Sequence, residues 1–121
     1  MGSLQPGRIV RATPPGLRGD WKEPPLIITS IWPDIRQTGM VSVICCSTKF
    51  PDPLPPGQHL LEWSDDGKGP TRLTEPTAVI CNWTAVIPAE DIDHRKIRGI
   101  VPSDVLRLIC REAGVPLKVS R

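Results

Sequence analysis

Residues 40–46 have the sequence MVSVICC, and this stretch decides the predicted fold. The run is short, apolar and rich in β-branched side chains, and it lies between Gly39 and the polar residues 47–49. These features predict a buried β-strand. A similar run, LIITSI at residues 26–31, ends before Pro33 and predicts a second, central buried strand. Together the two runs indicate a β-sheet at the centre of the molecule.

Further strands are predicted on both sides of these two. The segment RIVR at residues 8–11 alternates polar and apolar side chains, which is typical of a half-buried strand. Apolar segments near 58–63 and 77–87 predict two more strands, and the basic, alternating segment 96–100 predicts a last edge strand. Residues 88–92 open with a proline and are predicted to form one helical turn.

One longer helix is predicted near the end of the chain, at residues 103–113. Pro102 and Ser103 are start signals for this helix, and Gly114 is a stop signal. Apolar side chains recur at helical spacing and are expected to pack on the sheet. They belong to Leu106, Ile109, Cys110 and Ala113.

The overall composition supports a compact, mostly β protein. The 121 residues suit one domain, which we expect to span 1–121 with a core at about 6–115. The 15 prolines and 10 glycines lie between the apolar runs and predict short strands joined by turns. The predicted fold class is therefore mostly β, a barrel or strongly curled antiparallel sheet with one C-terminal α-helix.

Charge and cysteine usage exclude several classes of protein. The net charge of +2 is too small to identify a nucleic-acid-binding protein from composition alone. The four cysteines lie in apolar segments without CxxC spacing, which predicts buried, reduced thiols and a cytoplasmic location. Neither histidine has ligand spacing with a cysteine, so no metal and no cofactor are predicted. Neither a signal peptide nor a membrane-spanning run is expected.

The order and spacing of five segments resemble the MazF/PemK family of toxin–antitoxin ribonucleases. These segments are residues 6–10 (PGRIV), 25–30 (PLIITS), 43–49 (VICCSTK), 80–83 (ICNW) and 97–103 (IRGIVPS). The resemblance implies an SH3-like barrel that forms a homodimer. It also implies an mRNA interferase, a sequence-specific, metal-independent endoribonuclease that cuts single-stranded RNA and is blocked by its cognate antitoxin.

The same resemblance implies where the catalytic residues lie. Cleavage by the ribose 2′-OH requires a hydrogen-bond acceptor, a cation for the phosphorane charge and an acid for the leaving oxygen. Family members use a threonine at the end of the third strand, which Thr48 matches, with Ser47 beside it. They also use an arginine where this chain has Pro24, so Arg18 and Lys22 from the same loop are the expected cations.

The remaining candidates are weaker matches. Asn82 stands where the family has an aspartate, and it retains hydrogen bonding but not general-base chemistry. Trp21 is expected to stack on a base, and Lys49, Lys68 and Arg72 are expected to line a phosphate path. Each has an ordinary alternative, because an indole can fold onto its own loop and surface charges are commonly only solvated.

Two functions without catalysis stay open at this point. One is a barrel that binds a protein partner, as in the related CcdB-like toxins, and the other is a degenerate adaptor whose groove binds a peptide. The absent arginine favours both, whereas the Ser47–Thr48 pair and its neighbouring loop favour the ribonuclease. No glycine-rich phosphate loop, GxSxG or HExxH motif indicates another enzyme class.

Overall fold

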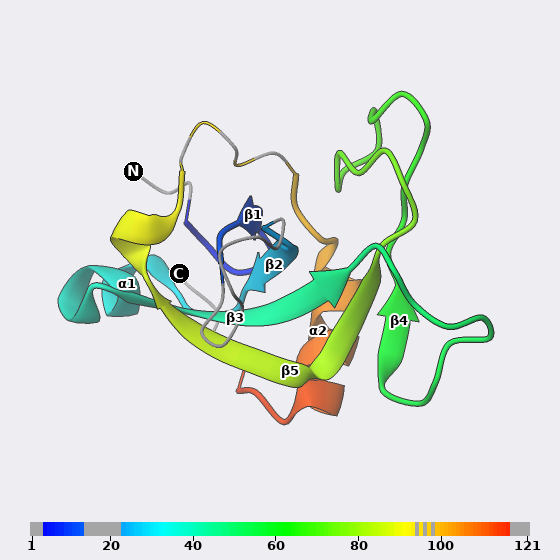
Figure 1. Ribbon diagram of the computed structural model, residues 1–121. Helices are drawn as coiled ribbons and strands as arrows, with labels where there is room; N and C mark the ends of the chain where they lie inside the picture. The colour runs from blue at the N-terminus through cyan, green and yellow to red at the C-terminus, as the bar shows by residue number, and fades with distance from the viewer. Residues whose placement is uncertain (1–3, 14–22, 94, 96, 98, 117–121) are drawn as a thin grey trace.

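The computed structural model describes residues 4–13, 23–93, 95, 97 and 99–116 of the chain. Figure 1 shows how the elements are arranged. In chain order they are β1 (Ile9–Arg11), β2 (Pro25–Ile28), α1 (Trp32–Thr38), β3 (Met40–Ser47), β4 (Gln58–Leu60), β5 (Ala78–Pro88), the 3₁₀ turn η1 (Ala89–Asp91) and α2 (Ser103–Ala113).

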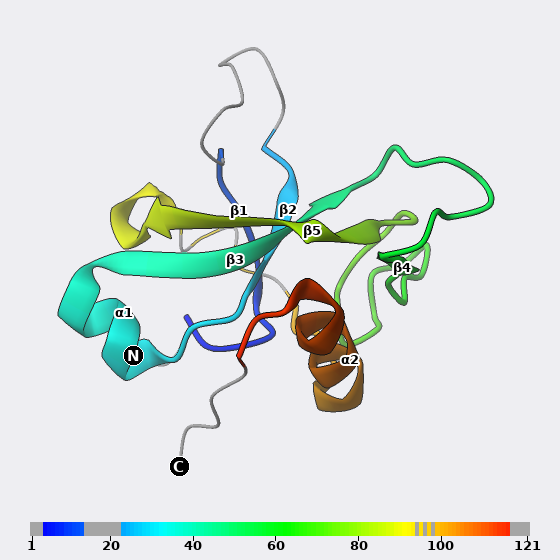
Figure 2. The same ribbon diagram turned by 90° about the horizontal axis from the view of Figure 1, so that it is seen from below.

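The strands form one antiparallel sheet in the order β1-β2-β3-β5-β4. β1 and β2 run steeply across the direction of β3 and β5, and α2 lies on one side of the sheet (Figure 2). Within the described residues β1 and β4 are the two edges, so the sheet is curled but not closed into a barrel. The predicted class, mostly β with a C-terminal helix, is confirmed.

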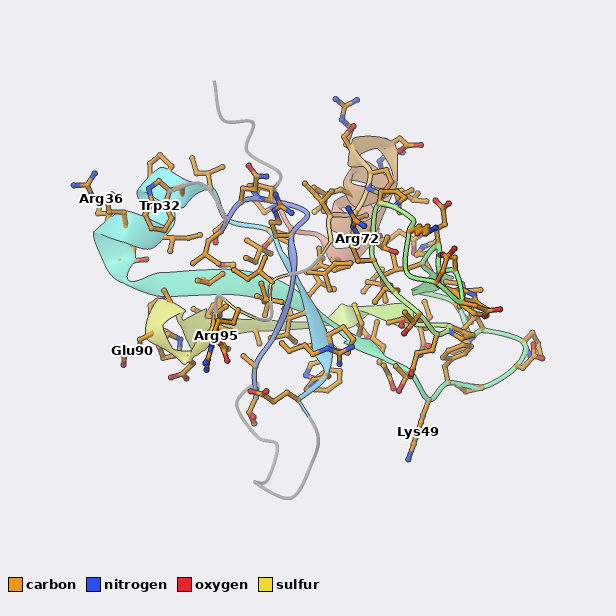
Figure 3. All side chains as sticks on the ribbon, turned by 90° about the horizontal axis from the view of Figure 1, so that it is seen from above. Trp32, Arg36, Lys49, Arg72, Glu90 and Arg95 are labelled. Carbon is orange, nitrogen blue, oxygen red and sulfur yellow. The ribbon has the colours of Figure 1, made fainter. Side chains whose placement is uncertain are left out.

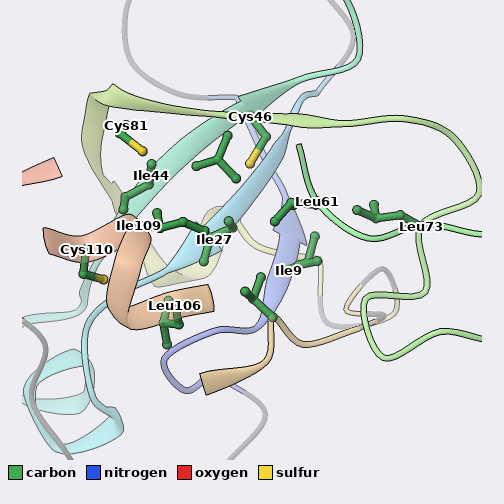
Figure 4. Close-up of a cluster of buried hydrophobic side chains, with 12 residues drawn as sticks. Ile9, Ile27, Ile44, Cys46, Leu61, Leu73, Cys81, Leu106, Ile109 and Cys110 are labelled. Carbon is green, nitrogen blue, oxygen red and sulfur yellow. The ribbon is translucent and has the colours of Figure 1, made fainter. Parts of the chain in front are cut away.

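Both faces of the central strand β3 are buried, which explains why its sequence is apolar apart from Ser42 and the terminal Ser47. Ile44 and Cys46 pack in the cluster beneath α2, whereas Val43 and Cys45 pack in a second cluster on the opposite face. Successive side chains of a strand point to opposite faces, so a strand covered on both sides has no position for an exposed polar residue. Figure 4 shows the cluster on the α2 side. Burying one such isoleucine contributes about 1.5–3 kcal/mol.

Helix α2 has the predicted bounds and the predicted buried face. Leu106, Ile109 and Cys110 are buried against the sheet, and Ala113 packs beside them. Gly114 ends the helix in the left-handed region at φ 70°, where its N–H donates to carbonyls of the last turn. This conformation suits glycine because it has no Cβ.

Helix α1 was not predicted, and the expected strand at 26–31 extends too far toward it. β2 ends at Ile28, and Pro33 lies in the first turn of α1 instead of only ending a strand. Proline is well tolerated at this position because the first N–H groups of a helix have no internal partner. Only Ile35 of the seven residues is buried, so the apolar periodicity of this helix is too weak to detect.

The last edge strand was predicted wrongly in extent. Of segment 96–100, the described residues contribute a single bridge, between Arg8 and Ile100. Gly99 lies so close to Thr71 that an added Cβ would overlap the Thr71 backbone, which explains why glycine is required there. β4 is also shorter than the predicted 58–63, while the single turn at η1 agrees with the prediction.

Two other sequence expectations concern the cysteines and membranes. All four cysteines are buried and free, as predicted. Among the described residues, none of the helices has the length and apolar character needed to span a bilayer.

Candidate functional site

Antiparallel pairing brings three chain segments to one end of the sheet. Arg11, the last residue of β1, pairs with Pro25, the first residue of β2. The next pair along, Leu26 with Cys45, places the end of β3 beside the start of β2. We call Arg11, Ser47 and Thr48 the β3-end site. Two predicted catalytic residues, Ser47 and Thr48, therefore lie at the same end of the sheet as an arginine.

The hydroxyl of Ser47 shapes the turn that presents Thr48. Ser47 Oγ donates to the carbonyl oxygen of Lys49 at 2.7 Å and accepts the Lys49 N–H at 3.0 Å. Such a bracket from a serine hydroxyl fixes the backbone of the turn between the two residues. Thr48 lies at the tip of this turn with its side chain exposed. Ser47 is thus a turn-forming residue, and Thr48 is the residue that solvent or a ligand reaches.

Arg11 is the cation that sequence analysis missed. Its side chain is half-buried, and Nη1 donates to the backbone oxygen of Glu23 at 3.3 Å. Burial raises the pKa of the nearby Cys46 thiol, and the positive charge of Arg11 opposes this rise. Arg11 therefore acts electrostatically on the residue directly before Ser47. Its pairing with Pro25 places Arg11 next to Pro24, the position where the family arginine is absent.

A small cavity joins Arg11 to one of the predicted RNA-binding residues. It has a volume of about 70 Å³ and is lined by Ile9, Arg11, Thr71, Arg72, Leu73, Thr74 and Glu75. Arg72 adopts a left-handed backbone conformation at φ 58°, which is uncommon for a residue with a Cβ. The buried hydroxyl of Thr71 donates to the Glu62 carbonyl at 2.6 Å and anchors this loop. Two arginines, one predicted and one missed, thus line one cavity.

Other predicted site residues are not gathered here. Asn82 is exposed and lies four residues beyond Ala78, the β5 partner of Ser47. Lys49 extends outward from the loop after β3, well separated from Arg72 (Figure 3). Lys68 is exposed in the turn after β4, where its N–H donates to Asp66. The predictions for Arg18, Trp21 and Lys22 fall outside the described residues.

The path of β5 explains why Asn82 is displaced from the β3-end site. Ile44 pairs with Thr84 and Cys46 pairs with Val79, so residues 80–83 of β5 lie opposite Cys45 alone. A bulge of this kind bends a strand and re-aims its side chains. Beyond the bulge β5 is still paired with β3 at Ala78 and Val79, and its other edge pairs there with β4, where His59 faces Val79.

An apolar hollow lies beside the start of α2. Its volume is about 450 Å³, and its lining residues are Leu60, Leu61, Glu62, Trp63, Thr71, Pro102 and Val105. Leu60 is 50% exposed and Trp63 is 37% exposed, which is unusual for side chains of this size. Trp63 was not among the predicted site residues, although its side chain is partly exposed.

The structure also gathers one group of side chains that metal ions commonly bind. His59, Cys81 and Glu112 each offer a ligand atom, and these atoms lie within 4.8 Å of one another. Spacing in the sequence did not indicate this group because its members come from β4, β5 and α2.

No family model and no curated protein sequence matches the chain. Solved structures match over nearly its whole length. MazF from Deinococcus radiodurans superposes with a TM-score of 0.67 at 13% identity, covering 94% of each chain. The chain has a MazF-like fold. A mycobacterial endoribonuclease superposes with a TM-score of 0.64 at 16% identity, covering 98% of each chain. A mycobacterial endoribonuclease in complex with its cognate antitoxin gives 0.62 at 15% identity, covering 94% of this chain and 98% of that one.

These identities are low, so the likeness establishes the fold. It confirms the mostly β, MazF-like fold that the sequence resemblance implied. The Arg11–Pro25 register and the turn at Thr48 are features of this chain's own sheet. What this chain does must be argued from its own residues.

Proposed function

We propose that this chain is the toxin of a toxin–antitoxin pair and cuts single-stranded RNA as an endoribonuclease. The observation that carries the proposal is the β3-end site, where an exposed threonine hydroxyl and a half-buried arginine lie at one end of a MazF-like sheet. Structures described as MazF and as endoribonucleases share this fold, which supports the assignment. The assignment of function remains a proposal because those proteins are only distantly similar in sequence.

The proposed chemistry uses the RNA's own 2′-OH. The 2′-OH gives its proton to water as its oxygen bonds to the adjacent phosphorus. The bond from phosphorus to the 5′-oxygen breaks, and that oxygen leaves with a proton taken from water. The products are a 2′,3′-cyclic phosphate and a 5′-hydroxyl end. Thr48 donates a hydrogen bond to the phosphate, and Arg11 stabilises the negative charge that develops on it.

Arg11 replaces the absent family arginine in this proposal. Pro24 cannot supply a cation, whereas Arg11 is in register with the next residue, Pro25. A guanidinium group presents paired donors that match phosphate geometry. Arg18 and Lys22 remain candidate cations, and Arg72 is a candidate for binding a neighbouring phosphate because it shares the Arg11 cavity. No metal takes part in this scheme.

Purified protein and single-stranded RNA of varied sequence provide the direct test. We expect cleavage in the presence of a chelator and cyclic-phosphate ends in the mass spectrum of the products. Thr48→Ala and Arg11→Ala should each slow cleavage strongly, whereas a double change of Arg18 and Lys22 to Ala tests the loop cations separately. Absence of cleavage across all sequences would remove the enzyme from the proposal.

An antitoxin and a second copy of the chain are the proposed protein partners. The antitoxin follows from the complex seen for a mycobacterial endoribonuclease of the same fold. Pairing of two copies follows from the family resemblance and from the exposed Leu60 and Trp63, which favour a covered surface. Light scattering at tens of micromolar protein tests the dimer, and a monomer mass would contradict it.

The protein-binding alternative rests on a specific observation as well. The apolar hollow at Leu60 and Trp63 suits a protein segment better than it suits RNA, because it offers few cations. If RNA is not cleaved but Trp63→Ala abolishes antitoxin binding, the CcdB-like or adaptor function replaces the ribonuclease.

A further inference from the structure

Three elements that are distant in sequence present metal-binding side chains to one point. His59 comes from β4, Cys81 from β5 and Glu112 from the last turn of α2. The Nε2 atom of His59 lies 3.1 Å from Oε1 of Glu112, and all three ligand atoms lie within 4.8 Å of one another. Figure 4 shows Cys81 on β5, above the part of α2 that carries Cys110.

The imidazole of His59 faces the Glu112 carboxylate at ion-pair distance but is not hydrogen-bonded to it. Its Nε2 atom is shielded from solvent and makes no hydrogen bond to the described part of the chain, although the Glu112 oxygen lies 3.1 Å away. The short distance therefore reflects proximity without hydrogen-bond alignment. A buried ring nitrogen without a hydrogen bond is unusual in native proteins. A bound cation would provide the missing partner, since neutral imidazole is a common metal ligand.

Cys81 brings a buried sulfur to the same point. Its side chain is 1% exposed and packs in the core cluster beneath α2. Its Sγ atom lies within 4.8 Å of the ligand atoms of His59 and Glu112. A divalent metal binds such a sulfur as the thiolate, which it stabilises directly.

We propose that His59, Cys81 and Glu112 bind one zinc ion, which ties the end of α2 to β4 and β5. Nitrogen, sulfur and carboxylate oxygen are the donors that zinc accepts, whereas calcium and magnesium prefer oxygen alone. Zinc bonds of about 2.0–2.3 Å place tetrahedral ligands roughly 3.3–3.8 Å apart. The present spacing approaches this range, so small side-chain rotations close the site. A water molecule takes the fourth position.

The proposed ion is independent of RNA cleavage. Cys81 packs in the cluster beneath α2, and its neighbour Asn82 is exposed. Within the described residues β4 has three residues and pairs with β5 alone, so a bond from His59 to α2 adds a link between the edge of the sheet and the helix. The ion is therefore structural, and cleavage at Thr48 does not require it.

Zinc affinity is measured on the full chain without a histidine tag, in the reduced state, by competition with a chromophoric chelator. We expect one zinc per chain and a rise in melting temperature when zinc is added. Cobalt should give a thiolate-to-metal charge-transfer absorption. Glu112→Gln should weaken binding at least tenfold, and His59→Gln and Cys81→Ser should weaken it about a hundredfold or more.

Two matched controls distinguish this site from general metal binding. Cys45→Ser changes a buried cysteine in the opposite core cluster, and Glu90→Gln changes an exposed glutamate on η1. Both should bind zinc like the unmodified chain. If Cys81→Ser does not fold, Glu112→Gln still decides, because that side chain is exposed. Absence of stoichiometric binding, or equal binding by Glu112→Gln and the controls, overturns the proposal whether or not the protein cleaves RNA.

Discussion

Replacing Arg11 with alanine tests the central step of the proposed mechanism. The guanidinium group is half-buried and donates a hydrogen bond of 3.3 Å to the Glu23 backbone. Removing that bond should cost about 1–3 kcal/mol of folding stability, which a domain of this size tolerates. The loss of a well-placed donor to the phosphorane should cost about 2.7–4 kcal/mol of transition-state stabilisation. The cleavage rate should therefore fall roughly 100- to 1,000-fold.

Single-turnover cleavage of a fluorogenic single-stranded RNA measures this effect, with thermal unfolding recorded on the same samples. Arg11→Lys should fall between the alanine variant and the unmodified chain, because lysine keeps the charge but not the paired donors. The matched control is Arg36→Ala, an exposed arginine that points outward from α1 (Figure 3). If Arg11→Ala cleaves within twofold of the unmodified chain, or Arg36→Ala loses as much activity, the assignment of Arg11 is refuted.

Three further predictions concern other parts of the molecule. Thr48→Ala should lower the cleavage rate at least tenfold without changing the melting temperature, since its side chain is exposed and Ser47 makes the turn's hydrogen bonds. Ile109→Ala should reduce the free energy of unfolding by about 2–5 kcal/mol, because the side chain is 0% exposed beneath the sheet. Leu108→Ala on the exposed face should change the free energy of unfolding by only about 0.5 kcal/mol. If the two variants lose equal stability in urea unfolding, the packing described for α2 is contradicted. Burial raises the pKa of Cys45 from 9.0 to about 11. The stability that the protonated thiol contributes to the folded chain is therefore complete below pH 9.0 and is lost as the pH rises toward 11. Over that interval the unmodified chain should lose about 2–3 kcal/mol more stability than Cys45→Ser, and parallel pH curves would contradict this.

The central strands could be predicted because burial on both faces leaves a simple pattern. Residues 41–46 are almost continuously buried, and such a run has few alternatives to a central strand. α2 could be predicted because its stop signal and its apolar stripe agree. α1 could not, since one buried residue in seven provides no periodicity. β2 and β4 were predicted to be too long, because apolar residues continue past the end of each strand.

The candidate site shows the same difference between local sequence pattern and long-range pairing. Thr48 could be predicted because it follows a strand whose end is visible in the sequence, and the family pattern marks that position. Arg11 belongs to a short strand with an ordinary alternating pattern, and its importance appears only when β1 pairs with β2. The His59–Cys81–Glu112 group was hidden for the same reason, because its members meet only after β4, β5 and α2 have packed.

The absence of an arginine at Pro24 therefore does not by itself argue against catalysis. A phosphorane is stabilised by the position of positive charge, and that position can be reached from more than one strand. In an antiparallel sheet the neighbouring strand lies about 4.7–4.9 Å away, which is less than the length of an extended arginine side chain. Arg11, the last residue of β1, pairs with Pro25, the first residue of β2. An arginine at position 11 therefore begins only one strand away from an arginine at position 24. A MazF-like sheet can thus lose the usual arginine and keep an arginine at the same end of the sheet as the exposed threonine.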